Sequence, residues 1–254
     1  MKVNLYDLEG NVKSQINLPK AFEYPYRPDI IKKVIHAFQS NSRQPYGVSP
    51  TAGLRRVGHN WGPNHGRARV MRRPDGDRGV IMNNMVGGRT AFAPTTQRIW
   101  YRKINKKEKL LSKLSALSMT SNKEMVKNRG HVFKNDLTLP VVVENALESI
   151  DNLEDALKFI EKLGLDGDIK RAKNGTKIRA GKGKLRGRKY YTPKSILIVV
   201  KNKEKVEKSF KNLPGVEVIT PNEINTEILA PGANPGRLTV FSENALEEVR
   251  GWIL

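Results

Sequence analysis

The chain has 254 residues, of which 46 are Lys or Arg and 25 are Asp or Glu, so its net charge is +21 and its isoelectric point is near 10.1. This charge favours a polyanionic partner, and nucleic acid is the leading candidate. An anionic membrane would require a basic amphipathic helix, which the glycine-rich basic segments do not predict. The chain has no cysteine, which excludes disulfides and cysteine-based zinc sites, and no apolar run approaches the roughly 20 residues that span a bilayer. The N-terminal residues show no signal-peptide pattern, so we expect a soluble, cytoplasmic protein.

The first part of the chain predicts two strands and a helix. Residues 3–18 contain two short segments of strand character, separated by turn residues at 7–11. Pro28 and Asp29 then open a helix. Its apolar residues recur at helical spacing: Ile30, Ile31, Val34, Ile35 and Phe38.

From residue 43 to residue 103 the sequence predicts neither helix nor strand. Eleven arginines stand against two acids there, Asp75 and Asp77, and glycine and proline recur throughout. Unstructured loops longer than about 15 residues are uncommon in compact domains and are usually functional or disordered. Disordered linkers favour Lys, Glu and Ser, whereas the planar guanidinium of arginine suits phosphate and stacks on bases. We predict that this segment has no core of its own and lies against RNA.

After residue 104 the predicted strands alternate with helices. We predict helices over 106–121, 151–164, 203–212, 221–225 and 242–253, and strands over 137–143, 195–200, 216–219 and 238–241. This alternation predicts an α/β fold in three layers, with a largely parallel sheet between flanking helices, a Rossmann-like topology without a nucleotide site. We expect one α/β domain over 1–254 with two insertions. The first is an extended Arg/Gly-rich loop at 44–102, and the second is a basic Gly-rich loop at 167–194.

The glycines of the second loop do not fit a nucleotide site. Five residues separate Gly175 from Gly181, where a phosphate-binding loop needs four, and Gly183 stands where Ser or Thr is required. The dinucleotide fingerprint fails because Arg186 occupies the place of its third glycine. We therefore predict no cofactor.

The acids and histidines of the first loop offer a weak metal pattern. Asp75 and Asp77 could hold Mg²⁺ in a nuclease, but the Pro-Asp-Gly sequence around Asp75 is strong turn chemistry and the loop has no further carboxylate. His59 and His65 lack enough neighbouring ligands, and contact with RNA is the favoured interpretation. We expect no metal site and no catalytic activity. The alternative is a basic, metal-dependent RNA-processing nuclease.

The second basic stretch, residues 169–195, contains eleven Lys or Arg and no acid. Solvated faces usually mix signs of charge, so this run favours a polyanion. Tyr190 and Tyr191 end the stretch, and they could stack on bases or cover the sheet. Four aromatic residues of the first loop alternate with arginine, as base stacking would need: Trp61, Phe92, Trp100 and Tyr101. The last two could instead belong to a returning strand and the core.

The charged and aromatic residues of both loops form one predicted RNA-binding set. Its members are Arg43, Arg55, Arg56, His59, Trp61, His65, Arg67, Arg69, Arg72, Arg73, Arg78, Arg89, Arg98, Arg102, Lys173, Lys177, Arg179, Lys182, Lys184, Arg186, Arg188 and Lys189. Phosphate contacts would give such a set affinity but little base specificity.

Two long segments carry a resemblance to a known family. The first is Arg89-Thr90-Ala91-Phe92-Ala93-Pro94-Thr95, which leads into Arg98-Ile99-Trp100-Tyr101-Arg102. The second is Arg179-Ala180-Gly181-Lys182-Gly183-Lys184 with Arg186-Gly187-Arg188-Lys189. Nearly the whole chain resembles large-subunit ribosomal protein four in its archaeal and eukaryotic branch, and the length resembles archaeal members. The chain has one residue more between Arg89 and Phe92 than the family pattern.

The resemblance implies a structural constituent of the large ribosomal subunit, placed on the cytoplasmic ribosome. It implies binding to large-subunit ribosomal RNA (rRNA), help in assembly, and a loop that lines the nascent-peptide exit tunnel. The implied partners are rRNA, neighbouring large-subunit proteins including protein twenty-two at the tunnel constriction, and the nascent peptide, with no membrane. The loop tip would lie near residues 66–77. The tip residues expected to face the tunnel are Arg67, Arg69, Met71, Arg72 and Arg73.

Overall fold

The computed structural model describes residues 1–52, 55, 58–80, 82–84 and 88–252. The chain divides into two compact units. Residues 1–38 and 103–254 form the first, the globular unit, and residues 39–102 form the second, the finger unit.

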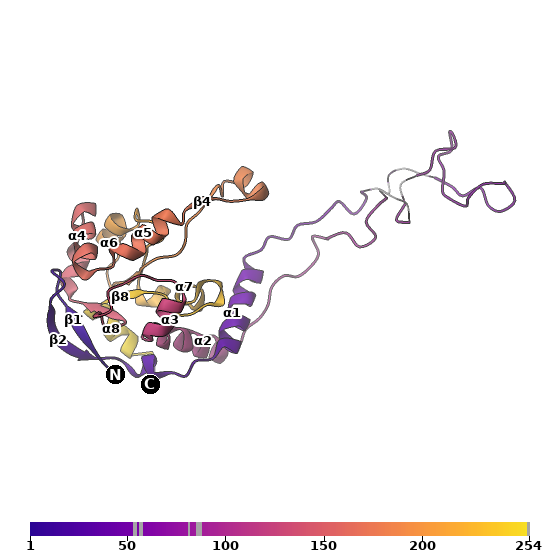
Figure 1. The fold of residues 1–254 in the computed structure, drawn as a ribbon. Helices are drawn as coiled ribbons and strands as arrows, with labels where there is room; N and C mark the ends of the chain where they lie inside the picture. Colours follow the sequence, from indigo (N-terminus) through magenta and orange to yellow (C-terminus); the bar gives the residue numbers. More distant parts are fainter. Residues whose placement is uncertain (53–54, 56–57, 81, 85–87, 253–254) are drawn as a thin grey trace. The chain divides into compact units, whose positions relative to one another are not determined.

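A six-stranded sheet forms the centre of the globular unit (Figure 1). The strands lie in the order β2-β1-β3-β8-β6-β7. β1 pairs with β2 in antiparallel fashion, whereas the other neighbouring strands are parallel. Their bounds are Lys2–Tyr6 (β1), Val12–Asn17 (β2), Val141–Val143 (β3), Leu197–Val199 (β6), Glu217–Ile219 (β7) and Thr239–Ser242 (β8).

Helices cover both faces of this sheet. Val141 and Val143 pack into one hydrophobic core, and Val142 packs into the other, because successive side chains of a strand point to opposite faces. The first core also receives α3 (Lys123–Asn128), α4 (Leu153–Leu163), α5 (Asp166–Asn174) and α6 (Glu204–Phe210). The second receives α1 (Pro28–Asn41), α2 (Lys106–Ser118), α7 (Thr226–Leu229) and α8 (Glu243–Arg250). The predicted three-layer α/β fold with a largely parallel sheet is confirmed.

Local sequence signals explain several helix ends. Gly164 ends α4 in the left-handed conformation, with φ at 73°, and its N–H donates to the carbonyl oxygens of Ile160 and Glu161. Ser242 begins α8, since its hydroxyl oxygen accepts from the N–H of Ala245 at 3.3 Å. None of the described helices combines the length and the apolar character needed to cross a membrane.

Most predicted elements are present, and the differences concern short ones. The strand predicted over 137–143 is limited to β3, and the helix predicted over 221–225 is a 3-10 turn at Pro221–Glu223. Three helices were not predicted: α3, α5 and α7. They have six, nine and four residues, so each is too short to display a helical period. Helix α5 covers the start of the second basic stretch, so its loop begins at Gly175.

Candidate nucleic-acid interface

The two arms of the finger unit are joined at their base by hydrogen bonds. Ser40 Oγ donates to the carbonyl oxygen of Trp100 at 2.7 Å. Asn41 uses its whole side-chain amide: its Oδ1 accepts from the N–H of Arg102 at 2.7 Å, and its Nδ2 donates to the Arg102 carbonyl oxygen at 3.2 Å. A Cβ at Gly47 would lie 2.7 Å from the carbonyl oxygen of Pro94, so glycine permits the close approach of the arms there.

Farther along, the finger unit folds back on itself in short antiparallel contacts. His59 and Arg72 exchange backbone hydrogen bonds at 3.0 and 3.1 Å, and the N–H of Arg73 donates to the carbonyl oxygen of Arg78 at 3.0 Å. Val80 is the one buried apolar side chain among the described residues of this unit. Backbone hydrogen bonds, with almost no apolar burial, therefore give the finger unit its local shape, and the predicted lack of a core holds apart from Val80.

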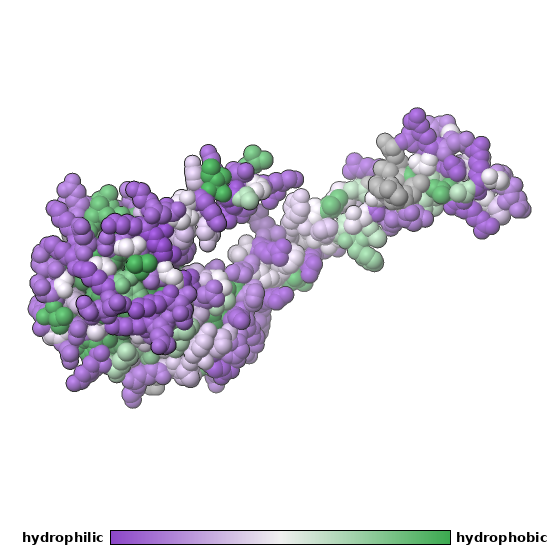
Figure 2. Space-filling model, in the orientation of Figure 1, coloured by the Kyte–Doolittle hydropathy of each residue, from purple (hydrophilic) through white to green (hydrophobic). Residues whose placement is uncertain are grey.

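The arginines of the finger unit are mostly exposed. Of those in the predicted RNA-binding set, Arg72, Arg73 and Arg89 are half-buried, and the other described ones are exposed. Arg56 lies outside the described residues. Hydrophilic residues dominate the visible face of the far end of the unit (Figure 2). Most of the described guanidinium groups of this unit are thus accessible from solvent.

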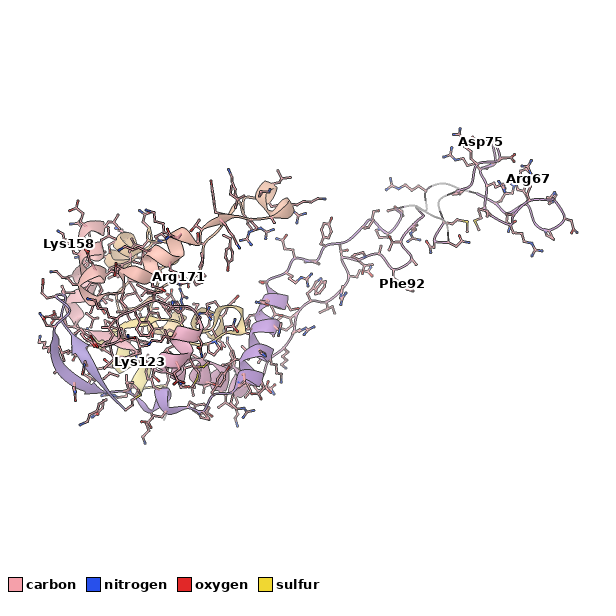
Figure 3. All side chains as sticks on the ribbon, in the orientation of Figure 1. Arg67, Asp75, Phe92, Lys123, Lys158 and Arg171 are labelled. Atoms are coloured by element: carbon pink, nitrogen blue, oxygen red, sulfur yellow. The ribbon has the colours of Figure 1, made fainter. Side chains whose placement is uncertain are left out.

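The aromatic residues of the finger unit divide into two kinds. The guanidinium groups of Arg43 and Arg98 lie over the Trp100 ring, with their Cζ atoms at 3.9 and 4.4 Å from its centroid. Phe92 and Tyr101, by contrast, expose 97% and 69% of their surface, and Phe92 stands clear of the chain in Figure 3. Neither Trp100 nor Tyr101 belongs to a strand or to the core, which removes the alternative left open by the sequence. Exposed rings of this kind can stack on unpaired bases.

Trp61 and the two histidines lie near the folded-back segment. Arg67 Cζ lies 4.9 Å from the Trp61 ring centroid, and His65 meets the same tryptophan edge to face at 6.1 Å. His59 and His65 are both exposed. In the described part of the chain, no group of three or more His, Cys, Asp or Glu residues is arranged to hold a metal ion.

Asp75 and Asp77 belong to a turn. The N–H of Gly76 donates to the carbonyl oxygen of Arg73 at 3.4 Å, as the Pro-Asp-Gly sequence predicted. The carboxylate of Asp77 pairs with Arg67 Nη1 (Figure 3 labels Arg67 and Asp75). Neither this arrangement nor any relative described below supports the nuclease alternative.

The second basic loop is a hairpin, which we call the basic hairpin (residues 175–194). Its two strands, β4 (Lys177–Ile178) and β5 (Tyr190–Tyr191), are antiparallel, and the 3-10 helix η3 (Gly181–Arg186) lies between them. Gly187 follows η3 at a φ of 73°, a conformation that favours glycine. Figure 1 shows β4 and the segment after it standing away from the layered body of the globular unit.

The predicted RNA-binding cations from Lys173 to Lys189 are exposed and lack carboxylate partners. None of the eight predicted RNA-binding residues from Lys173 to Lys189 forms an ion pair with a described residue. Tyr190 and Tyr191 expose 61% and 46% of their surface, so they do not cover the central sheet. Lys189 and Arg179 lie over these rings, at 5.5 and 5.6 Å from the centroids. This exposure removes the alternative that the two tyrosines cover the sheet, and base stacking stays a prediction.

Two buried charge clusters escaped sequence reasoning. His131 Nδ1 lies 3.0 Å from both carboxylate oxygens of Asp168, and Arg171 Nε donates to the same carboxylate at 2.8 Å. Arg237 is fully buried, where its Nη1 donates to Glu217 at 2.5 Å and its Nε donates to the carbonyl oxygen of Ser195 at 3.1 Å. Apart from Asp168 and Arg171, which lie three residues apart, the partners are distant in the chain and leave no spacing signal in one sequence.

Burial and hydrogen bonding set the charges in the first of these clusters. Burial lowers the pKa of His131 more strongly than Asp168 raises it, so the imidazole is neutral at pH 7. Burial alone would raise the pKa of Asp168, but hydrogen bonds from His131 and Arg171 outweigh it and lower that pKa. The cluster is therefore an Asp168–Arg171 ion pair with a neutral histidine beside it.

Comparison with known proteins accounts for nearly the whole chain. The sequence model of the ribosomal protein L4/L1 family matches residues 16–252. The protein named large ribosomal subunit protein uL4 from Archaeoglobus fulgidus is 45% identical over 253 residues, which cover 100% of both chains. The proteins of the same name from Thermoplasma acidophilum and Methanocaldococcus jannaschii are 45% and 46% identical, and each alignment covers at least 97% of both chains. The resemblance seen in the sequence is confirmed, and the chain belongs to the ribosomal protein L4/L1 family.

Proposed function

We propose that this chain is a structural constituent of the large ribosomal subunit, which acts by binding large-subunit rRNA and has no catalytic activity of its own. Family membership supports the ribosomal role, because the relatives are named as large-subunit proteins and align with this chain over nearly their full length. The observation that carries RNA binding is physical: two exposed, arginine- and lysine-rich segments hold almost no carboxylate and almost no core.

The finger unit and the basic hairpin would bind RNA by their cations. Phosphate contacts release counterions, and that release can offset the cost of ordering a segment, about 1–2 kcal/mol for each backbone residue. Exposed rings such as Phe92, Tyr101 and Tyr190 would stack on unpaired bases. During assembly these contacts would stabilise the folded rRNA.

The finger unit would also reach the nascent-peptide exit tunnel on the cytoplasmic ribosome. Residues 66–77 include the folded-back turn and the proposed tunnel-facing side chains Arg67, Arg69, Met71, Arg72 and Arg73. Protein twenty-two and the nascent peptide would be its neighbours there. Ion pairing of Arg67 with Asp77 supports a turn that keeps its own shape at the tip.

The proposal can be tested by reconstituting the large subunit from rRNA and purified proteins that include this chain. The chain should enter the particle, and a density map should place residues 43–102 and the basic hairpin against RNA. A chain that stays outside the particle would contradict the ribosomal role. Labelled rRNA incubated with the chain and Mg²⁺ should stay intact, and cleavage that disappears in Asp75→Ala would restore the nuclease alternative.

A further inference from the structure

A cavity of about 680 Å³ lies in the globular unit. The end of α3, the end of α5, the 3-10 turn η5 (Pro231–Ala233) and the last residues of the basic hairpin line it. Its volume lies within the range of about 300–1,000 Å³ that small-molecule sites occupy. The residues that give it chemical character are Tyr26, Arg129, His131, Arg171, Tyr191 and Lys194.

The wall of this cavity carries an excess of positive charge. Arg129, Arg171 and Lys194 line it, and no carboxylate does. Arg171 pairs with Asp168, and Lys194 shares Glu217 with Arg237, so four cationic side chains have two carboxylates between them. The excess favours an anionic ligand.

Arg129 is the cation without a carboxylate. Its Nη2 donates to the carbonyl oxygen of Pro231 at 3.1 Å, its Nη1 donates to that of Asn234, and no described residue forms an ion pair with it. Burial, together with the nearby charges of Arg237 and Arg171, lowers its pKa to about 10. The group therefore stays charged at neutral pH, and a bound anion would relieve the repulsion.

Two tyrosines add flat apolar surface beside these cations. Tyr26 and Tyr191 both line the cavity, yet each is more than 40% exposed, so their rings are accessible from solvent. Arg179 already lies over Tyr191, with its Cζ at 5.6 Å from the ring centroid. A planar group can stack on such rings.

His131 contributes an unused acceptor. Its Nδ1 faces the Asp168 carboxylate and so carries the proton, which leaves Nε2 as an acceptor in the neutral ring. Nε2 is buried, and no hydrogen-bond partner for it is found among the described residues. A hydroxyl or an amino group of a ligand could donate to it, and buried polar atoms normally have such a partner.

We propose that this cavity binds one nucleotide, with its base against Tyr26 or Tyr191 and its phosphate at Arg129 and Arg171. The ligand chemistry is that of a ribonucleotide, which could be one extruded from rRNA or a free one. The RNA source rests on the proposed function. Residues 191–194 of the basic hairpin form part of the wall, so an RNA strand bound along the hairpin would arrive at the cavity mouth.

The first test is equilibrium dialysis of the full chain with adenosine and uridine monophosphates at physiological salt. Binding should saturate at one site, and either Tyr26→Leu or Tyr191→Leu should weaken it about tenfold, because the ring on which the base stacks is lost. Unchanged affinity in both variants would contradict the proposal. Tyr46→Leu is the matched control, since Tyr46 is an exposed tyrosine that does not line the cavity. Its nucleotide affinity should stay within about twofold.

The second test is ultraviolet crosslinking of the chain inside the reconstituted large subunit, followed by nuclease digestion and mass spectrometry. A nucleotide adduct on Tyr26 or Tyr191 assigns the cavity to rRNA. Mononucleotide binding without such an adduct assigns it to a free nucleotide. Absence of both overturns the proposal, even where adducts on the finger unit and basic hairpin uphold RNA binding. A chain that fails to enter the subunit instead counts against the proposed function, and dialysis then decides on the cavity alone.

Discussion

Arg237 holds three segments of the globular unit together from a fully buried position. Besides Glu217 and Ser195, it donates through Nη1 to the carbonyl oxygen of Ile228 at 3.0 Å. Arg237→Met would remove every one of these donors, so we expect it to lower the free energy of unfolding by about 3 kcal/mol or more. Urea unfolding measures this.

A surface ion pair supplies the control for Arg237. Lys211 pairs with Glu207 at 2.8 Å but is 74% exposed, so Lys211→Met should change the free energy of unfolding by less than about 0.5 kcal/mol. Equal urea midpoints for the two variants would show that the buried arginine does not stabilise the fold.

His131 makes stability depend on pH. Because its pKa is lower in the folded chain than in the unfolded chain, the unfolded chain binds the proton more readily, and stability falls as pH drops below about 6.5. One proton contributes a slope of at most about 1.4 kcal/mol for each pH unit. His131→Asn keeps a donor for Asp168 but cannot titrate, so its unfolding free energy should depend less on pH between about 6.5 and 5. Identical slopes would refute this.

At the scale of elements, Gly215 positions the returning arm of the basic hairpin against the sheet. Its φ is 73°, its carbonyl oxygen accepts from the N–H of Ser195 at 2.9 Å, and an added Cβ would lie 2.2 Å from the carbonyl oxygen of Pro193. Gly215→Ala should therefore destabilise the chain by more than about 2 kcal/mol. Gly251→Ala, at a φ of −76° and with ordinary contacts, should be close to neutral, and thermal melting of both variants compares them. A neutral Gly215→Ala would show that the backbone yields there at little cost.

The stability of the globular unit should not depend on the finger unit. Val80 is its one buried apolar side chain among the residues described, so removal of residues 53–88 deletes almost no core. We expect the melting temperature of the free chain to change by less than about 2 °C. A fall of more than about 5 °C would mean that the finger unit packs on its own domain.

The sequence predicts long periodic elements well and short or non-local features poorly. Helix α1 and the apolar strands around Val142 and Ile198 follow from local patterns. The short helix α3 depends on the Asn122 cap, whose Oδ1 accepts from the N–H of Glu124 at 2.9 Å, and one cap is a weak signal by itself. The wall of the cavity combines residues from Tyr26 to Pro235, so only the folded chain brings it together.

At the scale of the whole molecule, carboxylates and unpaired cations lie in different parts of the chain. Carboxylates concentrate in the globular unit, where they pair with lysine and arginine, as Glu223 does with Lys203. The finger unit and the basic hairpin keep their cations largely unpaired. Composition alone shows the excess of charge, but the structure shows that it resides on exposed segments with little core.

Binding of large-subunit rRNA as a function of salt concentration tests most directly whether these exposed cations hold RNA phosphates. The logarithm of the binding constant should fall steeply with the logarithm of salt concentration. The triple variant Lys182→Gln, Lys184→Gln and Arg186→Gln of the basic hairpin should reduce that slope by about 2 to 3. Replacement of three lysines on and beside α6 by glutamine, at Lys205, Lys208 and Lys211, should leave the slope unchanged. Equal slopes for both triple variants would show that the cations of the basic hairpin do not hold RNA phosphates.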